Sequence, residues 1–205
     1  MIMEIVDRFI KLKFIYYLFV NKIKIVNIQF KYSNKLGEVM KFKANKLKGF
    51  ENKALYREFK INEVEYKWAL PLNFDFNPSI IVYHHTADNN MTPQKIDEIH
   101  KGRGWSGIGY HFYIRKDGVI YRGRPENSVG AHAPGVNSRA FGIAVEGNLN
   151  SENLTQSQMS SIIELSKYLM EKYNIKDLKR HKDVRNTECP GKNFPFEEIK
   201  TNLGI

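Results

Sequence analysis

The sequence predicts an α/β domain built around a central sheet over residues 59–205, preceded by a basic N-terminal extension over residues 1–58. Short β-branched and aromatic runs alternate with helical segments in the later part of the chain, as expected of an α/β domain. Residues 1–78 carry 15 Lys and Arg against 8 Asp and Glu, whereas residues 79–205 carry 17 against 14. With 205 residues and 42% hydrophobic content, the chain can form one domain of ordinary size plus a basic arm.

The N-terminal extension contains no cap, turn or periodic pattern that places an element in its first forty residues. Residues 37–40, Gly-Glu-Val-Met, can be encoded as GGA-GAG-GTG-ATG, which looks like a bacterial ribosome-binding site before a start codon. One hypothesis is therefore that residues 1–39 are translated leader, and the alternative is ordinary coding sequence. An intact Met1 terminus on the natively expressed protein would exclude the leader.

The elements of the domain follow in order from Phe59. Alternating apolar residues over Phe59–Trp68 predict an extended segment, and residues 80–84 predict a strand. Thr92 as N-cap and Pro93 at the first helical position predict a helix to about residue 101. The remaining elements are a hairpin of residues 110–115 and 119–122, a strand of residues 141–145 and a long helix that begins at the capping box of Thr155 and Gln158.

One cysteine and a pair of histidines predict a zinc site. Cys189 is the only cysteine, so an internal disulfide is excluded and its roles are apolar filler, nucleophile or metal ligand. It lies in a Cys-Pro-Gly loop eight residues after His181, and His84 and His85 lie about a hundred residues upstream. A catalytic zinc takes three protein ligands, and two imidazoles with one thiolate fit. Neighbouring strand residues point to opposite faces, so only one histidine of the pair faces the metal, and spacing does not say which.

Five motifs occur in an order that resembles a known family. They are residues 81–87 (Ile-Val-Tyr-His-His-Thr-Ala), 104–112 (Gly-Trp-Ser-Gly-Ile-Gly-Tyr-His-Phe), 130–137 (Gly-Ala-His-Ala-Pro-Gly-Val-Asn), 141–147 (Phe-Gly-Ile-Ala-Val-Glu-Gly), and 181–184 with 187–191 (His-Lys-Asp-Val and Thr-Glu-Cys-Pro-Gly). This order is similar to that of zinc-dependent N-acetylmuramoyl-L-alanine amidases of type 2, the family of phage endolysins, bacterial autolysins and animal peptidoglycan-recognition proteins. The resemblance covers roughly residues 78–195 and implies a central mixed β-sheet flanked by helices.

The resemblance implies a metal set and a reaction. The first histidine of the pair, His84, would bind Zn²⁺ together with His181 and Cys189, and His85 would lie behind the ligands in packing or hydrogen bonding. A zinc-activated water would then cleave the amide between N-acetylmuramic acid and L-alanine in bacterial peptidoglycan. The expected outcome is cell-wall degradation or lysis.

Two further residues match the family's catalytic positions. Tyr110 matches a tyrosine near the metal, which implies that it orients water or handles a proton. Thr187 stands where some phage relatives carry lysine and the recognition-protein branch carries threonine, so it could donate one hydrogen bond to an oxyanion but no charge. Other branches use a glutamate where this chain has Ala144, and Glu146 is not expected to replace it.

Four residues are expected to bind substrate. His132 and Asn137 match a segment that borders the substrate groove, although a loop histidine with a purely structural role is the alternative. Trp105 and Arg103 could line the groove by sugar stacking and carboxylate pairing. His111 is expected to be structural.

Three other functions compete with the amidase. A non-catalytic peptidoglycan-binding module is the nearest, but relatives of that kind lack the metal cysteine that this chain has at Cys189. A cysteine peptidase would use the same thiol as its nucleophile. Nucleic-acid binding is supported only by the charge of the arm, for which we instead expect affinity for anionic wall polymers.

The sequence also indicates where the protein acts. No stretch approaches the 18 or more apolar residues of a membrane span. The run Phe14–Val20 is short, lies between lysines and has no small-residue cleavage site after it, so a cleaved signal peptide is not expected. We therefore expect an endolysin-like protein held in the cytoplasm until release and acting on the cell wall, with an extracellular or wall-associated autolysin as the alternative.

Overall fold

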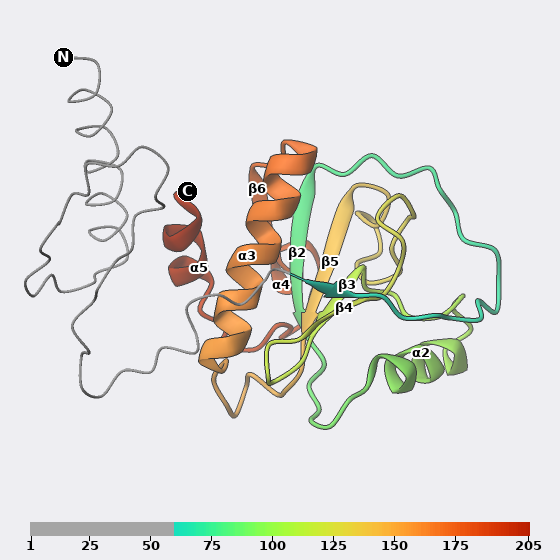
Figure 1. The fold of residues 1–205 in the computed structure, drawn as a ribbon, viewed down its shortest axis with the longest axis horizontal. Coiled ribbons are helices and arrows are strands. Elements are labelled where there is room, and N and C mark those ends of the chain that lie inside the picture. The colour runs from blue at the N-terminus through green and yellow to red at the C-terminus, as the bar shows by residue number, and fades with distance from the viewer. Residues whose placement is uncertain (1–59) are drawn as a thin grey trace, which may run out of the picture. The chain divides into compact units, whose positions relative to one another are not determined.

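The computed structural model describes residues 60–205, which form a mixed six-stranded sheet with helices on both sides (Figure 1). The strands are β1 (Ile61–Asn62), β2 (Ile80–His85), β3 (Phe112–Ile114), β4 (Ile120–Arg122), β5 (Ala140–Val145) and β6 (Asp177–Arg180). The helices are α2 (Pro93–Gly102), α3 (Gln156–Tyr173), α4 (His181–Val184) and α5 (Phe196–Leu203). The predicted fold class is confirmed. The expectations for residues 1–58, including the leader hypothesis, lie outside the described residues.

The strands are ordered β1-β4-β3-β5-β2-β6. Strand β2 runs parallel to β5 and to β6, and β3 is parallel to β5 but antiparallel to its hairpin partner β4. In the register of β2, His84 lies beside Ala144 of β5, and Tyr83 lies beside Arg180 of β6. The carboxyl ends of these three parallel strands therefore meet at one edge of the sheet, where ligands bind in many open α/β sheets.

One face of the sheet is apolar. Helices α3 and α5 cover it, and Figure 1 shows α3 lying alongside β2 and β5 on the side away from α2. The buried residues on this side include Ile81, Tyr83, Phe141, Ile143, Leu165 and Ile199. Within this apolar layer the hydroxyls of Tyr83 and Ser166 share a hydrogen bond of 2.7 Å.

The opposite face carries a mixture of apolar and polar side chains. Helix α2 and the loops on either side of the β3–β4 hairpin contribute Ile96, Ile108 and Ala133 to two small apolar clusters. Among them are buried histidines at positions 84, 100, 111 and 132. The chemistry expected from the sequence therefore concentrates on this face.

Helix starts agree with the sequence. Thr92 accepts a hydrogen bond from the Lys95 N–H at the start of α2, and Pro93 occupies the first turn. Thr155 and Gln158 form the predicted capping box of α3, which satisfies two backbone groups that a helix end otherwise leaves unpaired. No helix within residues 60–205 is long and apolar enough to cross a membrane.

The segment predicted to be extended over Phe59–Trp68 forms a strand only near its start among the described residues. Only Ile61–Asn62 pairs with β4, and the chain then leaves the sheet edge. The Tyr66 hydroxyl donates to the Arg122 carbonyl and Trp68 packs against the α2 side, so these aromatic residues anchor a covering segment without forming a ladder. Periodic apolar residues can serve either purpose. Strand β6 and helices α4 and α5 have no counterpart among the predicted elements.

Candidate metal centre

The ends of two neighbouring strands bring two histidines together. Because Arg180 ends β6 beside Tyr83 of β2, the next residue, His181, begins α4 beside His84, and their rings lie 4.4 Å apart between centroids. The loop that carries Cys189 is tied to the same point, since the Lys182 N–H donates to the Cys189 carbonyl at 2.9 Å. Three residues distant in sequence thus meet at one edge of the sheet.

His84, His181 and Cys189 form a group that can hold a metal ion. One potential ligand atom from each lies within 4.8 Å of the others. The distance from His84 Nδ1 to Cys189 Sγ is 3.7 Å, and a tetrahedral zinc with ordinary bond lengths separates nitrogen and sulfur ligands by about 3.6 Å. In residues 60–205 the buried side-chain polar atom without a hydrogen-bond partner is Nε2 of His181. A buried polar atom is costly unless a further group binds it, so the donor set fits a metal.

The electrostatics of the group also suit a metal. Burial, followed by the nearby histidines, lowers the pKa of His84 well below its usual range, and burial also lowers the pKa of His181. Both imidazoles are therefore neutral at pH 7 and offer a lone pair. Burial raises the pKa of the Cys189 thiol to about 11, so without a bound cation it stays protonated.

The ring of His85 makes its hydrogen bond away from the metal group. Its Nδ1 accepts a hydrogen bond from the Leu149 N–H at 3.1 Å, on the other face of β2. Its backbone N–H points at the Cys189 sulfur at 3.4 Å. The alternation of strand residues therefore separates the pair as the sequence predicts, and the His85 backbone helps to hold the thiol.

Tyr110 lies beside the metal group. Its ring centroid is 5.1 Å from that of His84. Burial and the nearby Cys189 both raise its pKa, so the phenol remains protonated and can donate a hydrogen bond. Thr187 accepts a hydrogen bond from the Cys189 N–H at 3.3 Å through its hydroxyl oxygen, which leaves the hydroxyl hydrogen for another acceptor.

His132 and Asn137 are placed differently from the expectation that they border a groove. His132 is 5% exposed, and its two ring nitrogens contact Nε2 of His84 and the carbonyl oxygen of Ala140, each at 3.0 Å. The Asn137 side-chain oxygen accepts from the backbone N–H groups of His132 and Ala133. A ring whose nitrogens are both engaged inside the protein has no donor or acceptor left for substrate, so His132 is not placed to hydrogen-bond it. Asn137 is partly exposed, and its contact with substrate stays a prediction.

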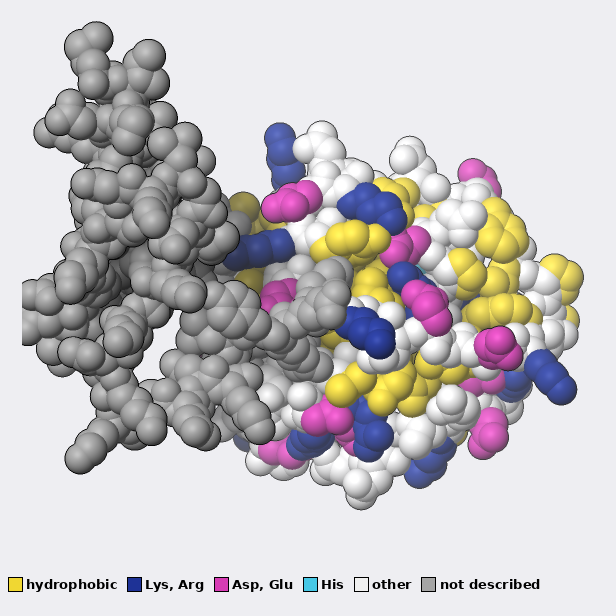
Figure 2. All heavy atoms as spheres, viewed as in Figure 1, with side chains coloured by type: hydrophobic (Ala, Val, Ile, Leu, Met, Phe, Trp, Pro, Cys, Tyr) yellow, Lys and Arg dark blue, Asp and Glu magenta, His cyan; other side chains and the backbone are white. Residues whose placement is uncertain are grey.

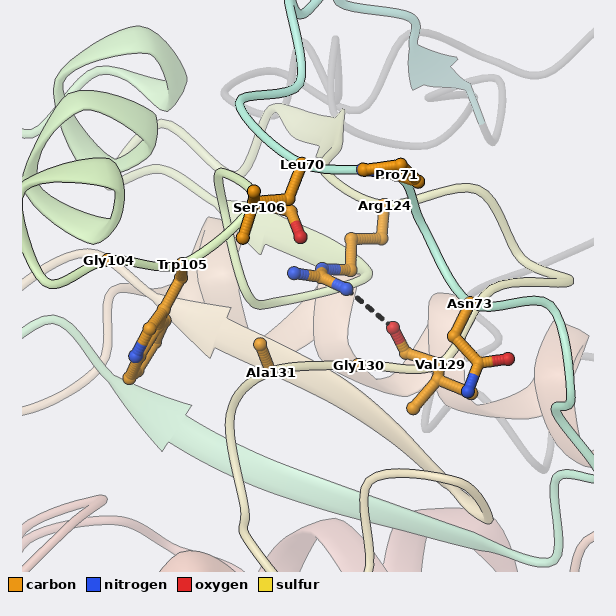
Figure 3. A pocket seen from close by; sticks show the side chains of 10 residues that line it. All are labelled: Leu70, Pro71, Asn73, Gly104, Trp105, Ser106, Arg124, Val129, Gly130 and Ala131. Carbon is orange, nitrogen blue, oxygen red and sulfur yellow. Dashed lines mark hydrogen bonds between the residues drawn. The ribbon is translucent and has the colours of Figure 1, made fainter.

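Trp105 lines a pocket of about 260 Å³ (Figure 3). The aromatic rings of Tyr110, His100 and Trp105 follow one another away from His84, with centroid separations of 5.4 and 4.6 Å along that row. Arg103 is exposed, and its guanidinium lies 5.7 Å from the Trp105 ring centroid. The structure thus connects Trp105 with the metal group, and Arg103 lies at its outer side.

The wall of this pocket opposite Trp105 is formed by Arg124. Figure 3 shows its guanidinium reaching toward the Val129 carbonyl, to which Nη1 donates at 2.7 Å. Nε donates to the Ile108 carbonyl, and the side chain is only 4% exposed. Burial lowers the pKa of this arginine, which nevertheless remains a cation at any physiological pH.

Two expectations concerning residues near the site agree with the structure. His111 is fully buried, where it accepts from the Gly142 N–H and contacts the Ser128 carbonyl, so its role is structural. Glu146 accepts from the Lys116 N–H and pairs with Arg115, away from the metal group.

Sequence reasoning missed two members of this region. His100 accepts from the Gly109 N–H, and burial lowers its pKa to about 4. Its spacing of four residues from buried Ile96 on α2 marks the inward face and could have found it. No local sequence signal identifies buried Arg124, because arginine is ordinarily exposed.

A His₂Cys group at the carboxyl ends of parallel strands, beside a protonated tyrosine and a pocket, is an arrangement typical of metal-dependent hydrolases. Comparison with known proteins identifies one family within this class. Residues 75–192 match the family model described as N-acetylmuramoyl-L-alanine amidase. The chain belongs to this family.

Individual relatives agree with that assignment. The endolysin of Enterobacteria phage T3 is 37% identical over 106 residues, which are 49% of this chain and 70% of that protein. Peptidoglycan-recognition protein SC2 of Drosophila melanogaster is 38% identical over 135 residues, 60% of this chain and 73% of that one. The solved structure of the N-acetylmuramoyl-L-alanine amidase LysC from Clostridium intestinale URNW is 77% identical, with a TM-score of 0.71 over 71% of this chain and 98% of that chain.

Proposed function

We propose that this amidase hydrolyses the bond between N-acetylmuramic acid and L-alanine in bacterial peptidoglycan, with Zn²⁺ held by His84, His181 and Cys189. The single observation that carries the proposal is the convergence of these three ligand atoms within 4.8 Å in a chain of the amidase family. The result of the reaction is degradation of the cell wall.

Tyr110 and Thr187 have different roles beside the metal. A zinc ion bound by two imidazoles and a thiolate supplies Lewis acidity, which activates water and polarises an amide carbonyl. Tyr110 stays protonated because burial and Cys189 raise its pKa, so its hydroxyl donates a hydrogen bond and orients the reacting groups. Thr187 fixes the Cys189 backbone through its oxygen and donates its hydroxyl hydrogen toward the developing oxyanion.

The groove beside the site is proposed to begin at Trp105. Its ring stacks on a sugar or stem-peptide group, and Arg103 at its outer edge pairs with a carboxylate of the polymer. The row of rings from His84 through Tyr110 and His100 supports this placement, because it connects the pocket with the reacting centre.

Mass spectrometry of digested peptidoglycan tests both reaction and metal. Purified walls incubated with the protein should gain new L-alanine amino termini at the rate of wall solubilisation. A chelator should abolish them, and added Zn²⁺ should restore them. New termini at another bond, or activity that survives complete metal removal, would refute the proposal.

Two rivals make different predictions in the same assay. A cysteine peptidase needs a thiolate, and the Cys189 pKa of about 11 leaves almost none at neutral pH. Its activity would survive a chelator and be lost to a thiol alkylator. A non-catalytic binding module would pellet with walls yet release no new amino termini.

The basic extension is proposed to add affinity for anionic wall polymers. Residues 60–205 hold 19 Lys and Arg against 17 Asp and Glu, and Figure 2 shows both signs interspersed on the visible face, so the basic excess belongs to the extension. Deleting residues 1–58 should weaken wall binding more than hydrolysis of soluble muropeptides, and equal loss of both would count against this role. The similarity to endolysins supports action on the wall after release from the cytoplasm.

A further inference from the structure

The ring nitrogen of His84 that points away from Cys189 contacts a second histidine, His132. Nε2 of His84 lies 3.0 Å from Nδ1 of His132, and the two rings meet edge to face with centroids 5.0 Å apart. The other nitrogen of His132, Nε2, lies 3.0 Å from the Ala140 carbonyl oxygen at the start of β5. These contacts form a short chain from a backbone carbonyl to the candidate metal ligand.

The carbonyl group at the end of this series of hydrogen bonds determines which ring nitrogen carries each hydrogen. A carbonyl oxygen only accepts, so Nε2 of His132 must carry the hydrogen. In a neutral imidazole the other nitrogen is then an acceptor, and Nδ1 of His132 receives the hydrogen of His84 Nε2. His84 in turn keeps a bare lone pair on Nδ1, the atom that faces Cys189 Sγ at 3.7 Å.

The His132 ring sits in a space that two glycines keep free. A Cβ built on Gly142, in the middle of β5, would lie 2.6 Å from the ring carbons Cγ and Cδ2 of His132. A Cβ on Gly130 would lie 2.5 Å from Cδ2 of the same ring. Glycine inside a strand is destabilising and often marks a place where another group approaches the backbone closely. Here the imidazole of His132 packs directly on the strand backbone.

The backbone that carries His132 is fixed as well. The side-chain oxygen of Asn137 accepts from the backbone N–H groups of His132 at 3.0 Å and Ala133 at 2.8 Å, closing the loop on itself. The loop also contacts its neighbour through the Ala131 N–H, which donates to the Gly109 carbonyl. Ring and backbone are therefore held independently.

We infer that His132 is a positioning residue, which selects the Nε2–H tautomer of His84 and aims its Nδ1 at the metal. The inference rests on the proposed function and extends it to a residue outside the ligand set. Hydrogen-bond partners of metal-bound histidines typically change metal affinity 10- to 100-fold when removed. A neutral imidazole acceptor also adds no negative charge to a ligand set that already contains a thiolate.

Three substitutions of His132 separate its two hydrogen bonds. In His132→Asn, the amide oxygen occupies the place of Nδ1 and still accepts from His84. In His132→Gln, the amide nitrogen occupies the place of Nε2 and donates to Ala140, but no acceptor faces His84. His132→Ala removes both. The matched control is His111→Asn, since His111 is also buried and lies 5.7 Å from His132 between ring centroids, but its two ring nitrogens contact backbone groups.

Zinc affinity is measured on the full-length protein by competition with a chromophoric chelator, with circular dichroism to confirm folding. Nitrogen-15 NMR of the metal-free protein reports the tautomer of His84. We expect His132→Ala and His132→Gln to bind zinc about tenfold or more weakly and to give His84 a mixture of tautomers. His132→Asn should keep most of the affinity and the Nε2–H signal, and His111→Asn should match wild type in both.

The outcomes distinguish this inference from the function on which it rests. If wild type binds no zinc, the proposed function fails. If wild type binds zinc and folded His132→Ala binds equally well with an unchanged His84 tautomer, the positioning role is wrong and the function stands. Equal weakening in His132→Asn and His132→Ala would likewise overturn it, because the retained acceptor would then make no difference.

Discussion

The two faces of the sheet are built from the same strands but stabilised in different ways. Against α3 and α5 the strands bury aliphatic and aromatic side chains in one continuous cluster. On the opposite face, alternate residues of the same strands meet histidines, an arginine and glycine-lined backbone, and the apolar clusters are small. Within β2, Tyr83 packs among aromatic rings of the first face, while its neighbour His84 joins the metal group on the second.

The residues that contribute most to the stability of the domain therefore lie on a different face from the residues of the metal group. Apolar packing contributes roughly in proportion to buried area and tolerates conservative change. Buried polar groups must each find a partner, so the second face depends on particular atoms and distances. Substitutions on the first face should therefore change the free energy of unfolding at constant activity, and substitutions on the second should change activity or metal affinity first.

The largest effect is expected from Cys189→Ser on the second face. Losing the thiolate ligand should reduce release of L-alanine termini by roughly a thousandfold or more, because a catalytic zinc site lowers the pKa of its bound water by about 9 units. Binding to purified walls in a pelleting assay should be largely retained. Chelated wild type is the matched control. Hydrolysis at more than a few per cent of the wild-type rate would contradict the assignment of Cys189 as a ligand.

Leu165→Ala should have the next largest effect, on the first face alone. Leu165 of α3 is fully buried in the apolar cluster, and truncation of such a leucine costs about 3 kcal/mol in the free energy of unfolding. Chemical denaturation measures the loss. Well below the melting temperature, kcat and zinc affinity should equal those of wild type, and a fall in either would show that the faces are coupled.

The same contrast explains what the sequence could predict. His84, His181 and Cys189 could be found because strand alternation and family motifs can both be recognised from the order of residues in the sequence. The structure adds that β6 places His181 beside His84. The role of His132 could not be found in this way, because it depends on a loop folding back against the backbone of β5 where Gly142 leaves room. The pattern over Phe59–Trp68 likewise did not show how little of this segment joins the sheet, because aromatic residues of a covering loop alternate much as those of a strand do.

Tyr110→Phe isolates one hydroxyl on the second face. The ring keeps its contacts with His84 and His100, so the melting temperature and zinc affinity should stay close to wild type. Loss of the hydrogen-bond donor should lower kcat by about a hundredfold. Steady-state kinetics on soluble muropeptides, together with zinc titration, measures both quantities. An unchanged kcat would remove Tyr110 from the reaction.

The smallest effect concerns acid, to which the buried histidines of the second face should respond. Burial lowers the pKa of His111 from 6.5 to about 4, so between these values the unfolded chain binds a proton that the folded chain does not. Stability from this group is therefore fully present above pH 6.5 and is lost as the pH falls toward 4. Between pH 7 and pH 5 the loss is about 2 kcal/mol.

Denaturant titrations of the chelated protein at pH 7 and pH 5 measure this loss, and His111→Asn isolates the contribution of one group. The variant is expected to be less stable at pH 7, because asparagine cannot keep both hydrogen bonds of the ring. Its stability should nevertheless fall less between the two pH values than that of wild type, by about 2 kcal/mol. Leu165→Ala should instead retain the wild-type pH dependence in full, since it removes no titratable group. Equal pH dependence in all three proteins would mean that His111 does not titrate differently on folding, and that the polar face owes its acid sensitivity to the other buried histidines.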